Sequence, residues 1–307
     1  MNAPVGGDAA ATKSRSAPES APPRKAKPAA WLGRLIGAIF TIPRDAIAAW
    51  FVAIGVTPNM LTILGFLATC AAAACFFLGG GHRHAELRGL GQPPYLLLAG
   101  ACLILASAFD MLDGAVARIG RLSTPLGAVL DSSVDRLSDV VVYIGLMGHF
   151  AVRGNLTYAV LAAVAMGSAM MISYVKARSE NLIPDCEVGY WVRGERSAAL
   201  LIGAFAGTMP AVLWQQSISA GLTVLRRLVW TYQVLAAQAA GRPPPPKTPS
   251  GAWGLLRPWR YPRGSWPSII ATAANILFII FAARISPLFG GGVDPLARLA
   301  AFVSGAR

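Results

Sequence analysis

Long apolar runs, separated by short polar or basic segments, dominate the chain from residue 58 onward. Most are about as long as the roughly 20 residues that a helix needs to cross the hydrocarbon core of a bilayer. They lack the short-period alternation of apolar and polar residues that marks the strands of a transmembrane barrel. The pattern therefore predicts an all-α, polytopic helical membrane protein. The expected spans are residues 58–80, 94–118, 126–151, 156–179 and 266–288.

Residues 196–240 fit two arrangements. They form either one span that ends near Trp214, which gives six transmembrane helices, or a helical hairpin that turns near Met209 and Pro210, which gives seven. Positive residues gather on the cytoplasmic side of membrane proteins. Arg226 and Arg227 would lie on the outer side of the membrane in the single-span arrangement and on the cytoplasmic side in the hairpin. Charge therefore favours the hairpin. Each arm of that hairpin is shorter than a full span, and the pattern leaves both arrangements open.

The regions outside these runs differ in composition. Residues 31–56 mix apolar and charged side chains and contain Pro43, which predicts a broken amphipathic helix lying on the membrane surface beside the bundle. The first residues are rich in Ala, Pro, Ser and Lys, a composition typical of disorder. We therefore expect a disordered cytoplasmic tail over 1–28, a membrane domain over 29–240, a Pro-rich basic linker over 241–264, and a C-terminal apolar segment and tail over 265–307.

Composition and charge agree with a membrane protein. The chain is 55% hydrophobic and 13% charged, with a mean hydropathy of +0.53, so a soluble domain would expose too much apolar surface. The net charge of +13 would suggest nucleic acid in a soluble protein. Here basic loops fix the topology and meet anionic lipid headgroups. We expect a multi-pass protein of the cell membrane, surrounded by lipids, with no nucleic-acid partner.

Four aspartates interrupt the apolar pattern near the ends of two predicted spans. Asp110 and Asp113 are three residues apart, and Asp131 and Asp135 are four apart, so each pair lies on one helix face. A carboxylate at the centre of a span costs about 2.5–3.5 kcal/mol. The loop 119–125 is short, so we expect the two helices to be antiparallel neighbours with converging carboxylates. Such oxygen ligands suit two Mg²⁺ or Mn²⁺ ions, which can clamp a displacement at phosphorus.

Small and basic residues accompany the aspartates. Gly114 and Ala117 leave room for a nucleotide beside the helix backbone, and Arg118 can reach a diphosphate as a planar donor. Gly127 leaves the opposite wall open, although a glycine there also permits close helix packing. The aspartate region therefore has the features of a site for a phosphate-containing ligand.

The same region resembles the signature of the CDP-alcohol phosphotransferase family: Asp110-x2-Asp113-Gly114-x2-Ala117-Arg118-x8-Gly127-x3-Asp131-x3-Asp135. The resemblance extends to "TPNMLT" at the first span and covers roughly 50–235. It implies a homodimeric membrane enzyme that moves a substituted phosphate from a CDP-linked donor, such as CDP-diacylglycerol, to an alcohol and releases CMP. It also implies that the first three aspartates are chiefly metal ligands, and that Asp135 is in addition the general base. Asn59 faces the nucleotide by this resemblance, and a helix-start role fits it equally.

Two basic stretches, "SYVKARSE" (173–180) and "VRGERSA" (192–198), flank the next predicted loop. Their basic residues would meet beside the aspartates and hold the phosphate of a phosphorylated acceptor, although positive loops also remain inside for topological reasons alone. Both stretches resemble the phosphatidylinositol-phosphate synthase branch, whose acceptor is inositol 1-phosphate, but Gly194 stands where that branch usually has Pro. Glycerol 3-phosphate, the acceptor of phosphatidylglycerophosphate synthases, is the close alternative. The predicted acceptor residues are Ser173, Lys176, Arg193 and Arg196.

A function of another class also uses acidic residues inside membrane helices. Ion-coupled transporters carry intramembrane aspartates, usually with paired halves and helices broken near the midplane. The apolar pattern of this chain shows neither feature. Its aspartates sit toward one membrane face, where a reaction at a lipid headgroup would take place.

Overall fold

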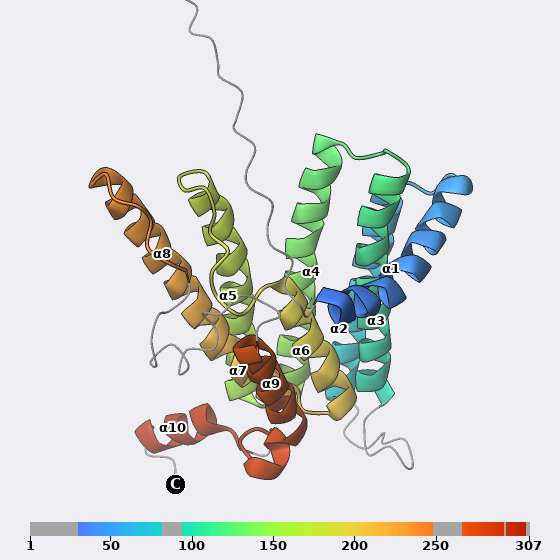
Figure 1. Ribbon diagram of the computed structural model, residues 1–307. Helices are drawn as coiled ribbons and strands as arrows, with labels where there is room; N and C mark the ends of the chain where they lie inside the picture. Colours follow the sequence, from blue (N-terminus) through green and yellow to red (C-terminus); the bar gives the residue numbers. More distant parts are fainter. Residues whose placement is uncertain (1–29, 82–93, 248–265, 292, 305–307) are drawn as a thin grey trace, which may run out of the picture. The chain divides into compact units, whose positions relative to one another are not determined.

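The computed structural model describes residues 30–81, 94–247, 266–291 and 293–304, and every regular element in these ranges is helical (Figure 1). Side chains are described for residues 42–81, 94–247, 269–291 and 293–304. The predicted tail over 1–28 and most of the predicted Pro-rich linker lie outside the described residues. The all-helical fold class predicted from the sequence is confirmed for the part of the chain that the structure describes.

Four long helices follow the predicted spans closely: α2 (Pro58–Gly81), α3 (Pro94–Ile119), α4 (Pro125–Val152) and α5 (Leu156–Glu180). Three of them, α2, α3 and α5, are long and apolar enough to cross a membrane. Helix α4 differs from these three because four charged residues lie within nine positions of it: Asp131, Asp135, Arg136 and Asp139. Apolar run length therefore located these helices well, because each run must be continuous to bury its backbone in lipid.

Helix α2 lies between α3 and α4 and packs along both, whereas direct packing between α3 and α4 is marginal over the described residues. Close approach depends on small residues. A Cβ on Gly80 of α2 would lie 2.6 Å from the carbonyl oxygen of His149 on α4, and a Cβ on Gly145 of α4 would lie 2.5 Å from the carbonyl oxygen of Ala73. The expected convergence of the carboxylates of α3 and α4 is confirmed for Asp110, Asp113 and Asp131, although both helices pack mainly on α2.

Residues 193–239 form a helical hairpin, and the number of times that this region crosses the membrane stays a prediction. Helix α6 (Arg193–Ala206) ends at Gly207, which has a φ of 69°, a conformation that favours glycine. The chain then reverses through α7 (Met209–Gln215), a π-helical turn η1 (Gln216–Ala220) and α8 (Gly221–Ala239). The side-chain amide of Gln216 donates to the Arg196 carbonyl at 3.1 Å, as expected for antiparallel arms. The arm formed by α6 has 14 residues, fewer than a full span needs.

Helix α1 (Ala30–Ala53) contains Pro43 within its length, and the broken amphipathic helix predicted here stays a prediction. From Arg44 onward the helix is part of the main bundle. Ala48 is fully buried in a cluster with Leu61 of α2 and Val116 of α3. A location of α1 at the membrane surface remains a prediction.

The C-terminal part consists of α9 (Trp266–Ile285) and α10 (Pro295–Val303). Before it, residues 242–246 form no helix and residues 248–265 lie outside the described ranges, so the linker stays a prediction. Lys247 pairs with Asp185 in the loop before α6, and its ammonium group holds the pKa of that carboxyl below its usual range. The linker is therefore attached to the bundle at its first end.

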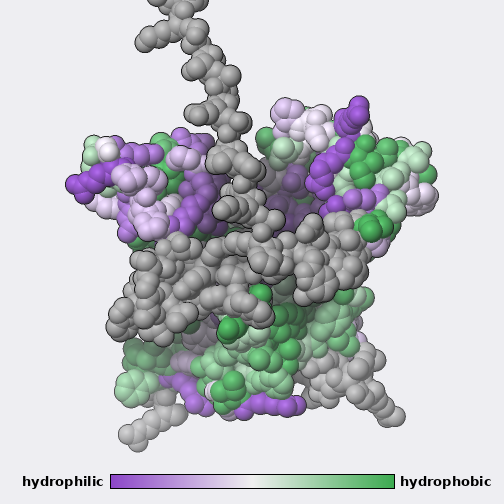
Figure 2. Space-filling view, in the orientation of Figure 1, coloured by the Kyte–Doolittle hydropathy of each residue, from purple (hydrophilic) through white to green (hydrophobic). Residues whose placement is uncertain are grey.

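Hydrophobic side chains gather between two hydrophilic zones on the face drawn in Figure 2, over the part of that face that is not grey. The exposed apolar residues include Leu64 and Leu67 of α2, Ile104 of α3 and Val164 of α5. An apolar band of this kind suits a lipid environment, where apolar surface has no reason to be buried inside the protein.

Candidate active site

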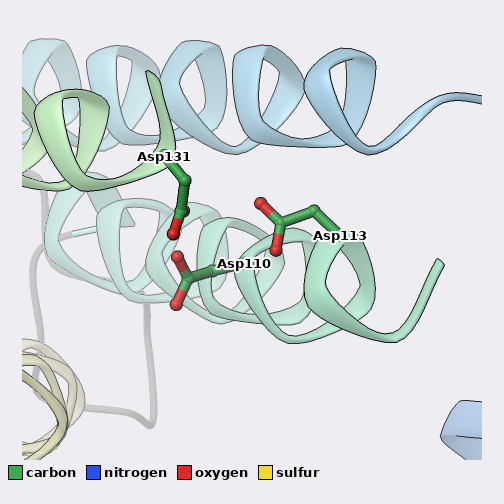
Figure 3. A group of neighbouring side chains, drawn as sticks. All are labelled: Asp110, Asp113 and Asp131. Carbon is green, nitrogen blue, oxygen red and sulfur yellow. The ribbon is translucent and has the colours of Figure 1, made fainter. Parts of the chain in front are cut away.

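Three aspartates converge at one end of the bundle. Asp110 and Asp113 extend from α3 and Asp131 from α4, and their carboxylates point toward a common space (Figure 3). One oxygen of each lies within 4.8 Å of the others. Hard divalent cations prefer clustered carboxylate oxygens. The donor set therefore fits a Mg²⁺ or Mn²⁺ ion, as the sequence predicted.

The buried member of the group is fixed by a hydrogen bond from α2. Asp113 is 6% exposed, and the hydroxyl of Thr62 donates to its Oδ2 at 2.7 Å. Thr62 is a site residue that the sequence reasoning did not assign. The available signal was its place as the last residue of "TPNMLT", one helical turn after Pro58. This hydrogen bond explains how α2, which carries no acidic residue, orients the acidic site.

Asp135 joins the group through an arginine of α6. Nη1 of Arg193 lies 2.9 Å from Oδ2 of Asp110 and 2.9 Å from Oδ1 of Asp135. All three side chains are partly exposed, at 31%, 42% and 26% respectively. Sequence reasoning placed Arg193 beside the aspartates for an acceptor phosphate, and the structure brings it into direct contact with two of them. Its guanidinium marks the position where an anion could lie next to Asp135.

One turn further along α6, Arg196 has a different environment from the one predicted. It is 1% exposed, and its Nη2 lies 2.5 Å from Oδ2 of Asp139 on α4. Its carbonyl accepts the hydrogen bond from Gln216, which in turn accepts one from the Tyr143 hydroxyl. In this structure the charge of Arg196 is paired inside the bundle, and its contact with an acceptor phosphate stays a prediction.

The other two predicted acceptor residues lie on α5. Nζ of Lys176 is 3.7 Å from Glu180 and 3.4 Å from Glu187, and all three side chains are at least about a third exposed. Exposed pairs of this kind are weak and exchange easily. Ser173 is half-buried on the same helix. Neither residue lines the cavity described next.

A cavity of about 570 Å³ opens beside the aspartates. Its charged lining residues are Asp110, Asp113, Asp135, Asp139 and Arg193, and small residues of α6 line the wall next to that arginine. Away from the charges the lining is mainly apolar, as required for a ligand with a charged head and a hydrophobic part. The apolar lining includes Phe66, Leu103, Ala106, Val142, Leu200 and Leu201.

The residues predicted to face a nucleotide lie at the start of α2, near the end of α3 and at the start of α4. A Cβ on Gly114 would meet only Nη1 of Arg118, at 3.5 Å, so the backbone of α3 is accessible there. A Cβ on Gly127 would lie 3.4 Å from Oδ1 of Asn59, which brings the start of α2 next to the start of α4. Ala117 is half-buried on α3. Their contact with a nucleotide remains a prediction.

The loop between the two aspartate-bearing helices is fixed by local hydrogen bonds. The amide of Leu122 donates to the Ala117 carbonyl at 2.9 Å, and Arg121 adopts a left-handed φ of 53°. Thr124 then caps α4, since its side chain accepts from the amide of Gly127 at 3.0 Å. A defined end and a defined start hold the carboxylates of the two helices in register.

Comparison with known proteins agrees with the site. A family model of CDP-alcohol phosphatidyltransferase matches residues 55–237. The archaetidylinositol phosphate synthase of Methanothermobacter thermautotrophicus is 34% identical over 189 residues, 59% of this chain and 86% of the relative. The phosphatidylinositol phosphate synthase of Mycobacterium tuberculosis is 35% identical over 197 residues, 64% of this chain and 82% of the relative.

Solved structures give the same result. The crystal structure of phosphatidylinositol phosphate synthase from Mycobacterium tuberculosis with CDP-DAG bound aligns with a TM-score of 0.53 and 28% identity, over 62% of this chain and 93% of the other. The same enzyme in complex with manganese and citrate aligns with a TM-score of 0.52 and 28% identity, over 62% and 88%. The chain belongs to the CDP-alcohol phosphatidyltransferase family and is a membrane transferase.

Proposed function

We propose that this transferase moves a phosphatidyl group from CDP-diacylglycerol to a phosphorylated alcohol, with inositol 1-phosphate as the favoured acceptor, and releases CMP. The observation that carries the acceptor assignment is the position of Arg193, 2.9 Å from both Asp110 and Asp135. A guanidinium is a planar donor for phosphate oxygens, and here it lies next to the residue that the family signature makes the base. A phosphate on the acceptor can bind Arg193 while a hydroxyl of the same molecule reaches Asp135.

The relatives support the same choice. The names of those described above refer to archaetidylinositol phosphate and phosphatidylinositol phosphate synthesis, and one solved relative has CDP-DAG bound. The polar end of the cavity suits the diphosphate of such a donor, and its apolar lining suits the lipid part. Residues proposed to contact the donor are Asn59, Gly114, Ala117, Arg118 and Gly127.

In the proposed reaction the acceptor hydroxyl attacks the phosphorus that carries the diacylglycerol. A new P–O bond forms, the P–O bond to CMP breaks, and the hydroxyl proton passes to Asp135. Asp110, Asp113 and Asp131, with Asp135 on the acceptor side, are the residues proposed to hold two divalent cations. When bound, these cations would neutralise the diphosphate and polarise its P–O bonds. Thr62 keeps Asp113 turned toward the site.

Arg193 has two roles in this scheme. Without ligands it neutralises Asp110 and Asp135, which would otherwise repel each other. With the acceptor bound, the guanidinium turns to the acceptor phosphate and leaves Asp135 free to take the proton. Lys176, held only by weak exposed pairs, and Ser173 are proposed as the outer part of the acceptor site.

Release of CMP tests the proposal directly. Detergent-purified protein is incubated with CDP-diacylglycerol and Mg²⁺ or Mn²⁺, and inositol 1-phosphate, glycerol 3-phosphate, inositol and glycerol are added one at a time. Asp113→Asn serves as the inactive control. The expected result is fastest release with inositol 1-phosphate. Faster release with free inositol or glycerol would refute the phosphate contact, and preference for glycerol 3-phosphate would replace the favoured acceptor. The ion-coupled transporter has no comparable support.

The arrangement in the membrane is part of the same proposal. We expect a multi-pass protein of the cell membrane with the aspartates facing the cytoplasm, where water-soluble acceptors are available. The hairpin and α9 favour seven membrane-inserted segments, of which α6 is short. A homodimer is expected from the family resemblance. Reactivity of single cysteines placed at Asn155 and Asn181, at opposite ends of α5, with a membrane-impermeant thiol reagent would test the orientation.

A further inference from the structure

Helix α9 is built into the bundle although it lies outside residues 55–237 that the family model matches. It packs on α6 and α7 (Figure 1). Ile279 is 2% exposed and belongs to the main hydrophobic cluster, together with Leu200 of α6 and Val212 of α7. Ala282 is fully buried. The opposite face of the helix exposes Ile270 and Leu277, at 65% and 55%. Helix α9 thus packs one face against the bundle and leaves the other exposed.

Two polar side chains on the bundle face of α9 have partners near the hairpin of residues 193–239, one just before its start and one just after its turn. The hydroxyls of Tyr190 and Thr272 are 2.9 Å apart. The side-chain amide of Gln215, on α7, donates to Oδ1 of Asn275, three residues after Thr272. Among the apolar residues of α9, polar groups need partners when water is absent, so these two contacts fix the rotation and the height of the helix.

The far end of the C-terminal segment is fixed separately. The carboxylate of Asp294 accepts hydrogen bonds from the amides of Leu156 at 2.7 Å and Thr157 at 3.1 Å, at the start of α5. The same group caps α10 by accepting from the amide of Ala297 at 3.1 Å. One side chain thereby joins the first turns of two helices. Together with the polar contacts of α9, it holds the whole segment against the bundle.

These contacts lead back to the acceptor side of the site. Tyr190 precedes Arg193 by three residues, immediately before α6 begins. Gln215 precedes Gln216, whose amide holds the Arg196 carbonyl of α6. We infer that α9 is a positioning element for the transferase, in which Thr272 and Asn275 set the place of α6 and therefore of Arg193 relative to Asp135. The inference rests on the proposed function only for the chemical nature of the acceptor.

The experiment measures steady-state CMP release for Thr272→Val, Tyr190→Phe, the two combined, and Asn275→Leu. One neutral hydrogen bond is worth about 0.5–1.5 kcal/mol, which corresponds to roughly 2- to 12-fold in the acceptor KM. Each single variant should raise the acceptor KM within this range and leave the donor KM unchanged. The Tyr190 and Thr272 variants combined should be no worse than either alone, because both remove the same contact. Thr272→Ser should retain the wild-type KM, and Leu277→Ala on the lipid-facing side is the matched control.

The outcomes separate positioning from simple stabilisation. If the variants lower the melting temperature in detergent but leave both KM values at the wild-type level, α9 only stabilises the fold and the inference is wrong. Equal rises in donor and acceptor KM would also overturn it. If the wild-type enzyme proves to use an unphosphorylated alcohol, the proposed acceptor fails by itself, and the same variants are measured with the alcohol that is used.

Discussion

Two ion pairs one helical turn apart connect α6 to α4, and they differ in almost every physical property. The outer pair joins Arg193 to Asp135, is partly exposed and lines the cavity. The inner pair joins Arg196 to Asp139 and is almost fully enclosed, with 2% and 11% of the side chains exposed. The same two residue types therefore give one partly exposed contact and one almost fully enclosed contact, whose Asp139 also lines the cavity.

The difference shows why charge type does not define function in this region. A solvent-accessible pair loses little when a phosphate takes the place of the carboxylate, since both are anions of similar geometry. A buried pair leaves an uncompensated charge in the bundle when either member is removed. We therefore expect the outer pair to control kinetics and the inner pair to control stability, and the following experiments test that division.

The largest effect is expected for the outer carboxylate. Asp135→Asn removes the proposed base, and general base catalysis contributes about 10²- to 10⁴-fold, so turnover should fall by that factor. Binding of CDP-diacylglycerol, measured by isothermal titration, should remain. Turnover within a few-fold of wild type would exclude Asp135 as the base. Chelation with EDTA should abolish CMP release in the wild-type enzyme to at least the same extent.

Breaking the inner pair should instead destabilise the folded protein. Arg196→Gln leaves Asp139 buried and unpaired, which costs about 3–5 kcal/mol. The expected readout is a large fall in the detergent melting temperature, with the acceptor KM of the remaining folded enzyme close to wild type. Arg196→Gln combined with Asp139→Asn should recover part of the stability. A stable Arg196→Gln variant with a strongly raised acceptor KM would restore the phosphate-binding role predicted from the sequence.

The outer arginine should give the reverse pattern. Each charge-assisted contact to phosphate is worth roughly 1.5–3 kcal/mol, so Arg193→Gln should raise the acceptor KM by about 10- to 150-fold. The melting temperature should change little, because the pair is partly exposed. Arg193→Lys is the matched variant and should recover only part of the affinity, since lysine lacks the planar fork. A rise confined to the donor KM would move Arg193 to the nucleotide side.

A smaller effect is expected at α2. Thr62→Val keeps the volume and removes the hydrogen bond to Asp113. Loss of a hydrogen bond to a charged group costs about 1.5–3 kcal/mol. Part of this cost should appear as a higher metal concentration for half-maximal activity. Thr62→Ser should behave as wild type. An unchanged metal requirement in the valine variant would leave Asp113 oriented by α3 alone.

The smallest effect is expected for the N-terminal tail. Residues 1–28 contain no member of either ion pair and no candidate site residue. Their deletion should leave activity per folded molecule nearly unchanged, measured as CMP release normalised to monodisperse protein. A large loss of specific activity at equal expression would assign the tail a role that its composition does not indicate.

The spacing of residues along the sequence predicted some of the site residues but not their separate environments. The spacing of Asp110, Asp113 and Asp131 predicted a metal centre, and the structure brings their carboxylates together. Sequence reasoning also named Arg193 but gave Arg196 the same role. Two residues three apart on a helix point in similar directions, so the pattern has no means to separate them. Thr62 was missed because a threonine near the start of an apolar helix is common and carries no charge.

The sequence by itself determined which segments are helices and where the acidic groups lie along them. A membrane helix must satisfy its backbone within one continuous apolar run, and this requirement is local. Only the tertiary structure decided that α2 packs along both α3 and α4, that residues 193–239 form a hairpin, and that α9 packs on α6. These outcomes depend on which small or polar residues of distant helices meet, such as Gly145 with Ala73 and Tyr190 with Thr272. Contacts of this kind are set by packing in three dimensions, for which the apolar pattern of a single helix carries no information.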